Sequence, residues 1–430
     1  MSRSDTQQPV PEEKAPAQHD FALESVPQKQ RRSGYALVTV WVGWAISTSS
    51  LLVGGTVGAG TSFGVGLTAI VIGNTILAII AALVGFVGFR TGLTTYLASR
   101  SIFGDRGSAV PSLLLGVLAM GFIGVLMDAF ATAMNQLVPS VPWLLWIVLF
   151  TIAITATAIF GFKGLAVLSV VSAPAMVLFA IVSVVRISEG DGLATAVAAE
   201  PVEPIGFQAA LTAVIATWIT GATLVSDVGR YARRPVHIVI GAVCGYVVGA
   251  GVFEATAMLS ASAAGNGNFV VVMSQLGLLL PAALILALTL WTTTDNNLYS
   301  ASLAFTNASR TFGRTIDKRV WVLVSVAIAV ATALAGFASD FGAFLGIIAT
   351  VTPPFAGIFI AHFYVLGHLR TVGSAPLPAV RWSALGAWLA TALLAYLVDL
   401  PVEPVSGLLI AGAVYSVAGL LSRRTESRQS

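Results

Sequence analysis

Charged side chains are scarce in this chain. Only 10% of its 430 residues are Asp, Glu, Lys or Arg, whereas about 25% is usual for a soluble protein. Hydrophobic residues make up 57% of the sequence, which is too large a share for a surface that faces water. The composition excludes a soluble enzyme and a disordered protein, and it indicates a chain with many membrane-spanning segments.

Cysteine and metal-binding patterns are nearly absent as well. Cys244 is the only cysteine, so no disulfide can form within the chain and thiol redox chemistry is not expected. The apolar runs contain no His-Glu-x-x-His motif and no cluster of metal-ligating side chains. We therefore expect neither an enzyme nor a bound cofactor.

Long apolar runs occupy most of the sequence. They extend for about 20 residues without a charge, the length of a transmembrane helix, and they lack the alternating pattern of a membrane barrel. Residues 1–33 are polar and are expected to form a disordered cytoplasmic tail. The sequence predicts an all-α polytopic membrane protein with twelve transmembrane helices, at about 34–57, 64–89, 109–137, 142–161, 164–185, 206–226, 237–262, 272–300, 320–338, 342–366, 382–398 and 404–422.

The positions of the charges support this topology. If residues 1–33 are cytoplasmic, all of the 22 Lys and Arg residues except Arg186 fall on the cytoplasmic side, as the positive-inside rule requires. Acidic residues such as Glu189 and Glu203 collect on the opposite face. We expect a multi-pass protein of the cell membrane (the inner or plasma membrane) with both termini in the cytoplasm.

Two of the predicted helices carry residues that weaken a helix in lipid. The first contains hydroxyl side chains at residues 47–50, followed by Gly54 and Gly58, and the sixth contains a similar cluster at residues 217–221. Interrupted helices at matching positions of two inverted halves mark the binding sites of transporters. The alternative is that these small residues serve close helix packing.

The eighth predicted helix has a polar face. Thr289, Thr292, Thr293 and Asn296 stand at positions i, i+3, i+4 and i+7 and therefore share one side of a helix. Their hydroxyl oxygens, with carbonyls freed by the break in the first helix, suit a small hard cation such as sodium. The alternative is that the hydroxyls bond back to their own helix.

Two aromatic residues and two acids are further candidates. Phe122 and Trp218 could hold a flat heteroaromatic ring between them if they face one cavity, although aromatic residues in membrane helices commonly serve packing. Asp128 and Glu254 lie within predicted helices, where acids are candidates for proton transfer, for gating or for attracting a cationic substrate. Internal hydrogen bonding is the alternative for both acids.

Four motifs of this chain occur together in a known group of transporters. They are Gly54-Gly55-Thr56-Val57-Gly58, Arg90-Thr91-Gly92-Leu93-Thr94-Thr95, Pro111-Ser112-Leu113-Leu114-Leu115-Gly116 and Trp291-Thr292-Thr293-Thr294-Asp295-Asn296. In this combination, and over nearly the whole chain from about residue 34, the sequence resembles the cytosine permease (purine-cytosine permease) branch of the nucleobase–cation symporter family.

The resemblance implies a 5+5 inverted-repeat fold, like that of sodium-coupled amino-acid symporters, with broken helices 1 and 6. Its parts would be a first five-helix repeat at 34–187, an inverted second repeat at 205–366, two additional helices at 382–422 and a cytoplasmic tail at 423–430. The implied function is cation-coupled import of a nucleobase such as cytosine, or of a related flat nitrogen heterocycle, by alternating access.

The resemblance also implies site residues. The coupling ion would be sodium, bound by the carbonyls of Gly43, Ile46 and Thr289 and by the hydroxyls of Thr292 and Thr293. The base would lie between Phe122 and Trp218, with Thr217, Thr220 and the backbone at Ser47 contacting its edge.

The substrate site departs from cytosine permeases at several positions. Those proteins have Trp in place of Phe122 and Phe in place of Trp218, so the aromatic pair is kept with its members exchanged. Ala119 replaces a glutamine and Thr289 replaces an asparagine, which removes two amides suited to reading a pyrimidine edge. We therefore expect an importer of a flat nitrogen heterocycle, with cytosine as one candidate.

Other functions remain open from the sequence. A proton-coupled permease for a purine, a hydroxymethylpyrimidine or a cationic heterocycle, working through Asp128 or Glu254, is the main alternative. A channel or sensor is a third reading, although no selectivity-filter motif is visible. We expect the lipid bilayer and a small nucleobase-like molecule as partners, no nucleic acid and no obligate protein partner.

Overall fold

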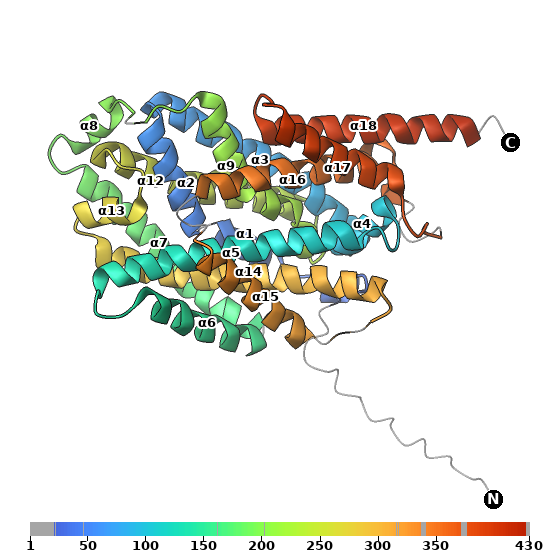
Figure 1. Ribbon diagram of the computed structural model, residues 1–430, viewed down its shortest axis with the longest axis horizontal. Coiled ribbons are helices and arrows are strands. Elements are labelled where there is room, and N and C mark those ends of the chain that lie inside the picture. Colours follow the sequence, from blue (N-terminus) through green and yellow to red (C-terminus); the bar gives the residue numbers. More distant parts are fainter. Residues whose placement is uncertain are drawn as a thin grey trace, which may run out of the picture.

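The structure is a bundle of helices (Figure 1). The computed structural model describes residues 21, 23–45, 47–160, 162–201, 203–314, 316, 318–336, 341–370 and 376–426. Within these ranges every regular element is helical, and the only strand-like feature is an isolated bridge between Arg32 and Ala232. The predicted all-α class is confirmed.

The helices follow one another in this order: η1 (Gln28–Gln30), α1 (Gly34–Ala45), α2 (Thr48–Gly60), α3 (Phe63–Thr91), α4 (Thr95–Phe103), α5 (Ala109–Leu137), α6 (Trp143–Phe160), α7 (Phe162–Ile187), α8 (Gly192–Ala198), α9 (Phe207–Thr223), α10 (Ser226–Gly229), α11 (Val236–Ala242), η2 (Val243–Ala250), α12 (Gly251–Ala264), α13 (Phe269–Gln275), α14 (Leu279–Thr311), α15 (Lys318–Leu334), α16 (Phe341–Ile360), η4 (Ala361–Val365), η5 (His368–Arg370), α17 (Trp382–Leu397) and α18 (Glu403–Glu426). The elements η2 and η4 are π-helical turns that continue α11 and α16.

Apolar helices lie at every predicted transmembrane position. Six helical segments in the described part of the chain are long and apolar enough to cross a membrane: Phe63–Thr91, Ala109–Leu137, Phe207–Gly229, Val236–Ala264, Gly342–Val365 and Glu403–Ser422. The pair α1 and α2 passes the same test as one bent segment. The remaining predicted positions hold shorter apolar helices, at Trp143–Ala156, Pro174–Ile187, Leu279–Trp291, Val320–Leu334 and Trp382–Leu397.

The first predicted span is interrupted where its hydroxyl cluster begins. Helix α1 ends at Ala45 and α2 begins at Thr48, with a bend of 48° between them. Ser47 caps α2, because its side chain accepts a hydrogen bond from the Ser49 backbone amide at 3.2 Å. The predicted break in the first helix is confirmed.

The predicted break at residues 217–221 is wrong. Helix α9 runs without interruption from Phe207 to Thr223, and only a short irregularity at residues 224–225 separates it from α10. The hydroxyls of Thr217 and Thr223 donate to the carbonyls of Ala213 and Ile219, one turn earlier, at 2.8 and 2.7 Å. These side chains therefore add hydrogen bonds along the helix axis, and the helix stays intact.

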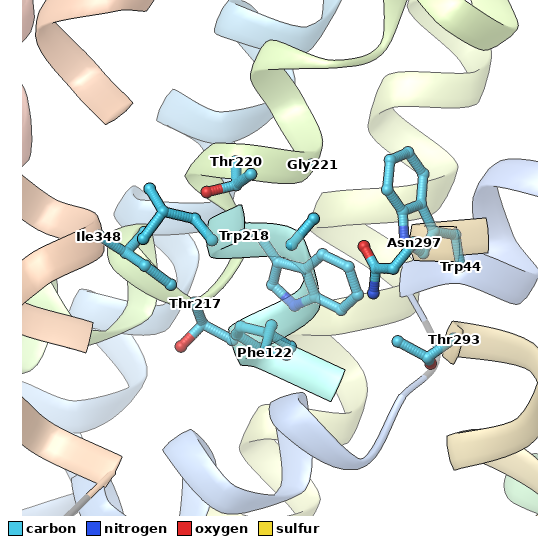
Figure 2. A pocket seen from close by; sticks show the side chains of 11 residues that line it. Trp44, Phe122, Thr217, Trp218, Thr220, Gly221, Thr293, Asn297 and Ile348 are labelled. Carbon is cyan, nitrogen blue, oxygen red and sulfur yellow. The ribbon is translucent and has the colours of Figure 1, made fainter. Parts of the chain in front are cut away.

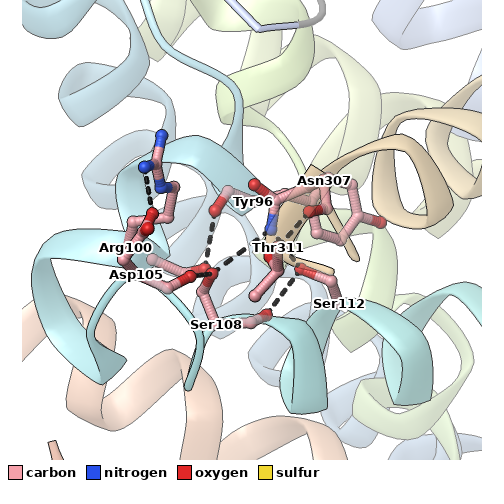
Figure 3. A network of polar contacts seen from close by, with 8 residues as sticks. Tyr96, Arg100, Asp105, Ser108, Ser112, Asn307 and Thr311 are labelled. Carbon is pink, nitrogen blue, oxygen red and sulfur yellow. Dashed lines mark hydrogen bonds and ion pairs between the residues drawn. The ribbon is translucent and has the colours of Figure 1, made fainter. Parts of the chain in front are cut away.

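The eighth span also differs from its predicted bounds of 272–300. Gly277 adopts the left-handed conformation, with φ +67°, which ends α13 and lets α14 begin at Leu279. At its other end α14 continues to Thr311 and packs along α5 (Figure 1). Asn307 of α14 donates to Ser112 of α5 at 2.9 Å and to Ser108 at 3.4 Å (Figure 3). This polar contact joins α5 to the part of α14 that extends beyond its apolar segment.

Short helices mark the two ends of the bundle. Helices α8 and α13 lie at one end and α4 lies at the other, which we call the α4 end (Figure 1). Arg100 of α4 forms an ion pair with Asp105, which lies just beyond the helix (Figure 3). Between the two ends, α3 packs against α9 and α2 packs against α12.

Glycines allow the close approach of α2 and α12. A Cβ atom on Gly54 would lie 2.3 Å from the Glu254 carbonyl oxygen, and one on Gly58 would lie 2.3 Å from the Met258 carbonyl oxygen. Close packing, which the sequence left open as an alternative role for these glycines, is therefore present beside the helix break.

The Gly58→Ala variant is expected to unfold at lower temperature than the parent protein. The added methyl group would push α2 away from the backbone of α12, and overpacking of this kind costs about 1–3 kcal/mol. Gly64→Ala is the matched control, because a Cβ atom on Gly64 would meet nothing within 4 Å and alanine favours a helix over glycine. Thermal unfolding in detergent compares the two; an equal shift in both would contradict the packing role.

Candidate functional site

A cavity lies in the interior of the bundle, beside the break between α1 and α2. The space outside the protein atoms here, open solvent included, is about 360 Å³. Its walls come from five helices, α1, α5, α9, α14 and α16, and the residues are Trp44, Leu118, Ala119, Phe122, Thr217, Trp218, Thr220, Gly221, Thr293, Asn297 and Ile348. Figure 2 shows Ile348 and Thr217 on one side of the Trp218 ring, with Asn297 and Trp44 on the other.

Trp218 is held against the broken helix. Its indole Nε1 donates to the Ser50 hydroxyl at 3.0 Å, and that hydroxyl donates to the Ala45 carbonyl across the break at 3.2 Å. The Trp44 ring meets the Trp218 ring edge-on, with centroids 6.5 Å apart. The orientation of one cavity wall therefore depends on the conformation of the break.

Phe122 provides the second predicted ring. It comes from α5 and lines the same cavity as Trp218. Its ring packs against Phe344 of α16, with centroids 5.9 Å apart. The structure thus brings together the two aromatic residues that the sequence singled out, from helices far apart in the chain.

The predicted edge contacts fall into two groups. Thr217, Thr220 and Ala119 line the cavity, and the Thr220 hydroxyl also bonds the Thr352 hydroxyl at 3.2 Å. Ser47 and Thr289 are fully buried but do not line it. Ser47 caps α2, and the Thr289 hydroxyl lies 2.7 Å from the Thr48 hydroxyl, which links α14 to the start of α2.

Buried oxygen atoms that suit an ion are present both at the end of α1 and on α14. Gly43 lies buried in the last turn of α1, where helix carbonyls have no partner within the helix. The Thr293 hydroxyl is buried and lacks a hydrogen-bond partner within the described part of the chain. Such oxygens suit a hard cation. Ile46 and the Thr292 side chain, also predicted ligands, lie outside what the structure describes.

The two predicted acids lie away from the cavity. Asp128 accepts a hydrogen bond from the Trp143 indole at 3.0 Å. Glu254 is fully buried and accepts from the Asn74 amide at 2.5 Å, while its other carboxylate oxygen has no partner among the described residues. In the described ranges, no group of three or more His, Cys, Asp or Glu side chains could hold a metal ion.

Polar contacts join several segments of the chain at the α4 end of the bundle. Asp227 accepts from the backbone amide of Thr95, at the start of α4, at 2.9 Å. Arg230 donates to the Phe21 carbonyl at 2.7 Å, and the Arg32 amide donates to the Tyr231 carbonyl at 2.7 Å. Burial, and to a lesser extent the nearby Asp227 carboxylate, raises the pKa of Tyr96 well above its usual value.

Sequence reasoning missed three cavity residues of note: Trp44, Asn297 and Ile348. Asn297 stands four residues after Thr293, so a face extended by one further turn from Thr293 would have included it. Trp44 stands three residues before the hydroxyl cluster at residues 47–50, and this position beside the predicted break could have identified it. Ile348 is an ordinary apolar residue in an apolar helix and offered none.

Comparison with known proteins finds related sequences. A family model described as "Permease for cytosine/purines, uracil, thiamine, allantoin" matches residues 25–375. The cytosine permease of Escherichia coli (strain K12) is 32% identical over 346 residues, which cover 80% of this chain and 81% of that protein. The hydantoin permease of Microbacterium maritypicum is 22% identical over 364 residues, covering 78% of this chain and 73% of that protein.

Solved structures share the fold. Mhp1, a nucleobase-cation-symport-1 family transporter in a closed conformation with bromovinylhydantoin bound, matches with a TM-score of 0.79 and 21% identity, covering 93% of this chain and 95% of that chain. A Na⁺-coupled sialic acid symporter in a substrate-bound outward-open state matches with a TM-score of 0.67 and 14% identity. The match covers 91% of this chain and 90% of that chain.

Proposed function

The chain belongs to the permease family for cytosine/purines, uracil, thiamine and allantoin, the nucleobase–cation symporters, and from this premise we propose that it imports a flat nitrogen heterocycle, with cytosine as one candidate, coupled to sodium. It is a membrane permease rather than an enzyme. The observation that carries the proposal is the cavity that Phe122 and Trp218 line beside the break in the first span.

The proposed topology has twelve transmembrane helices. The bent pair α1–α2, the six long apolar segments and the five shorter apolar helices together supply them. In this proposal, residues 34–187 and 205–366 are the two inverted repeats and residues 382–422 hold the two additional helices. Both termini lie in the cytoplasm, because that orientation puts nearly all Lys and Arg residues inside.

The substrate ring would lie between the faces of Phe122 and Trp218. Aromatic contacts of this type contribute about 0.5–1.5 kcal/mol beyond the burial of area. The hydroxyls of Thr217 and Thr220 line the same cavity and can contact the ring edge. Ala119 offers only a methyl group there. The backbone at Ser47 is proposed as a further edge contact if α1 and α2 shift on binding.

Sodium would bind between α1 and α14. The proposed ligands are the carbonyls of Gly43, Ile46 and Thr289 and the hydroxyls of Thr292 and Thr293. The fit rests on the Thr293 hydroxyl, which is buried and lacks a partner in the described part of the chain. A cation at this position would supply the missing interaction.

The same contacts suggest how ion and substrate are coupled. Sodium at the break would fix α2 relative to α1, and the Ser50 hydroxyl would then hold the Trp218 indole in place. Sodium binding therefore favours the substrate-binding conformation, and coupling follows from this difference in affinity between states. Opening toward the cytoplasm would require the contacts at the α4 end to break.

Uptake measurements test this proposal. Cells that express the protein are supplied with labelled cytosine with and without sodium, and unlabelled purines, pyrimidines and thiamine precursors are added as competitors. Sodium-dependent uptake of cytosine, or competition by another ring, supports the proposal. If the uptake of every ring tested is the same with and without sodium, the result would contradict the proposal.

Proton coupling is a second candidate, favoured by one observation. Glu254 is fully buried between α12 and α3, and one of its carboxylate oxygens lacks a partner among the described residues. Ionisable groups inside membrane proteins commonly serve proton relays. Asp128, which accepts from Trp143, is the other acid in this reading.

The Glu254→Gln variant separates the two candidates. Glutamine keeps the shape and the contact with Asn74 but cannot carry a proton, so the sodium account expects uptake within about twofold of the parent, as for the loss of a modest hydrogen bond. Uptake is measured at several pH values, with Asp128→Asn in parallel. A large fall in uptake in either variant, with the remaining uptake no longer varying with pH, would favour proton coupling.

A further inference from the structure

A groove lies at the α4 end of the bundle, where the last turns of α3 meet η4 and η5. The space outside the protein atoms here, open solvent included, is about 830 Å³. The residues that line it are Phe86, Arg90, Phe363, Tyr364, Gly367 and Leu369, and we call it the Arg90 groove. None of these residues lines the central cavity, so the proposed transport site does not account for the groove.

Two backbone features shape the wall opposite α3. Helix α16 ends in the π-helical turn η4, and such turns are frequent at functional sites. Gly367 then adopts the left-handed conformation, with φ +72°, and a Cβ atom there would meet nothing within 4 Å. The Tyr364 hydroxyl donates to the Leu83 carbonyl of α3 at 2.6 Å. This bond holds η4 beside α3 while Gly367 leaves the space next to it open.

Arg90 ends the exposed apolar side of α3. Ile72, Ile79 and Phe86 are spaced by two helical turns and share this side, and Ile72 and Ile79 are 39% and 55% exposed, which suits contact with lipid. Helix α3 has 29 residues and is therefore about 43 Å long, whereas the hydrocarbon core is about 30 Å thick. A charged residue in its last turn thus lies at the level of the lipid headgroups.

The charge of Arg90 is not balanced within the groove. Its side chain is exposed and forms neither a hydrogen bond nor an ion pair with another described residue, and no acid is among the residues of the groove. A guanidinium group matches the geometry of a phosphate. Basic pockets between transmembrane helices on the cytoplasmic side bind anionic lipid headgroups.

We propose that the Arg90 groove binds an anionic phospholipid of the cytoplasmic leaflet. The phosphate lies on the Arg90 guanidinium, and an acyl chain lies on the apolar side chains of Phe86 and Leu369. The bound lipid joins α3 to η4 and η5 and stabilises their packing. This inference rests on the proposed orientation, which puts the α4 end in the cytoplasm, and it is independent of the proposed substrate and coupling ion.

Thermal unfolding of the purified full-length protein in a nonionic detergent tests the proposal. Phosphatidylglycerol, phosphatidylcholine and inorganic phosphate are titrated separately, because a molecule that binds the folded state raises the unfolding temperature. We expect phosphatidylglycerol to stabilise the protein at lower concentrations than the other two. An equal response to phosphatidylcholine would exclude recognition of the charge, and an equal response to inorganic phosphate would indicate a site for a free anion; either result overturns the proposal.

The Arg90→Gln variant is expected to need about fivefold more phosphatidylglycerol for half of the maximal shift, the effect of one basic residue beside anionic lipid. Arg90→Lys keeps the charge and is expected to stay closer to the parent protein. Arg310→Gln is the matched control, because Arg310 is also exposed in the last turn of a helix, α14, but does not line the groove. Its response to phosphatidylglycerol should equal that of the parent.

The comparison uses the shift that the lipid causes in each variant. Arg90 lies in the last turn of α3, where the helix dipole favours a cation, so its removal can lower the unfolding temperature without any lipid. If Arg90→Gln keeps the parent's response to phosphatidylglycerol, or if Arg310→Gln loses as much of that response as Arg90→Gln does, the lipid site is overturned. The proposed transport function would stand in either case.

Discussion

Replacing Thr293 with alanine is expected to raise the sodium concentration needed for half-maximal uptake by about tenfold or more. Its hydroxyl is buried, lacks a partner in the described part of the chain and lies where α14 meets the helix break. Loss of a polar contact to a charged group costs about 1.5–3 kcal/mol, and each 1.4 kcal/mol corresponds to a factor of ten. Initial uptake rates over a sodium series measure the change.

Thr306→Ala is the matched control for this experiment. Thr306 lies on the same helix, and its hydroxyl donates to the Ser302 carbonyl of the preceding turn at 2.7 Å. The same substitution there should leave the sodium dependence unchanged. Unaltered sodium dependence in Thr293→Ala would exclude Thr293 as a ligand, and an equal change in both variants would indicate a general effect on α14.

The Trp218→Ala variant is expected to lose substrate uptake by about a hundredfold or more. Truncating a buried aromatic residue at the centre of a binding site costs about 2–4 kcal/mol of binding free energy, and here the ring forms a wall of the cavity and donates to the Ser50 hydroxyl. Trp218→Phe keeps an aromatic wall but loses the bond from Nε1. We expect this variant to bind substrate several-fold more weakly, in line with about 1 kcal/mol for a hydrogen bond.

The effect of Trp218 must be separated from a loss of folding. Trp388→Phe removes a comparable bond, from Nε1 to the Val351 carbonyl at 2.9 Å, at a buried site outside the cavity. Uptake by Trp388→Phe should stay close to that of the parent at equal amounts of folded protein. If both phenylalanine variants reduce uptake to the same extent, Trp218 acts through stability and not through the substrate.

The pattern of apolar runs was sufficient to predict where the long apolar helices lie, but not which of them are interrupted. The hydroxyl cluster at residues 47–50 breaks the first span, whereas the similar cluster at 217–221 does not break α9. The difference is in hydrogen bonding, because Thr217 bonds to its own helix while Ser47 caps a new one. Gly277 was overlooked in an apolar run, although its left-handed conformation ends α13.

The site was predicted in part. The aromatic pair Phe122 and Trp218 and the cavity hydroxyls of Thr217 and Thr220 were named from the sequence, and the structure gathers them around one cavity. On α14, Thr293 lines the cavity as well, whereas Thr289 meets Thr48 instead, and Asn297, which was not predicted, faces the cavity. Helical periodicity gives spacing along a face, but only packing against other helices decides which residue points inward.

The central claim is that a sodium gradient drives the import of a flat nitrogen heterocycle. The most direct test uses purified protein in liposomes, with the labelled ring that binds most tightly, under an inward sodium gradient and equal pH on both sides. We predict accumulation above the external concentration that disappears when the sodium gradient is dissipated. Accumulation driven by a proton gradient without sodium, or simple equilibration across the membrane, would contradict the account.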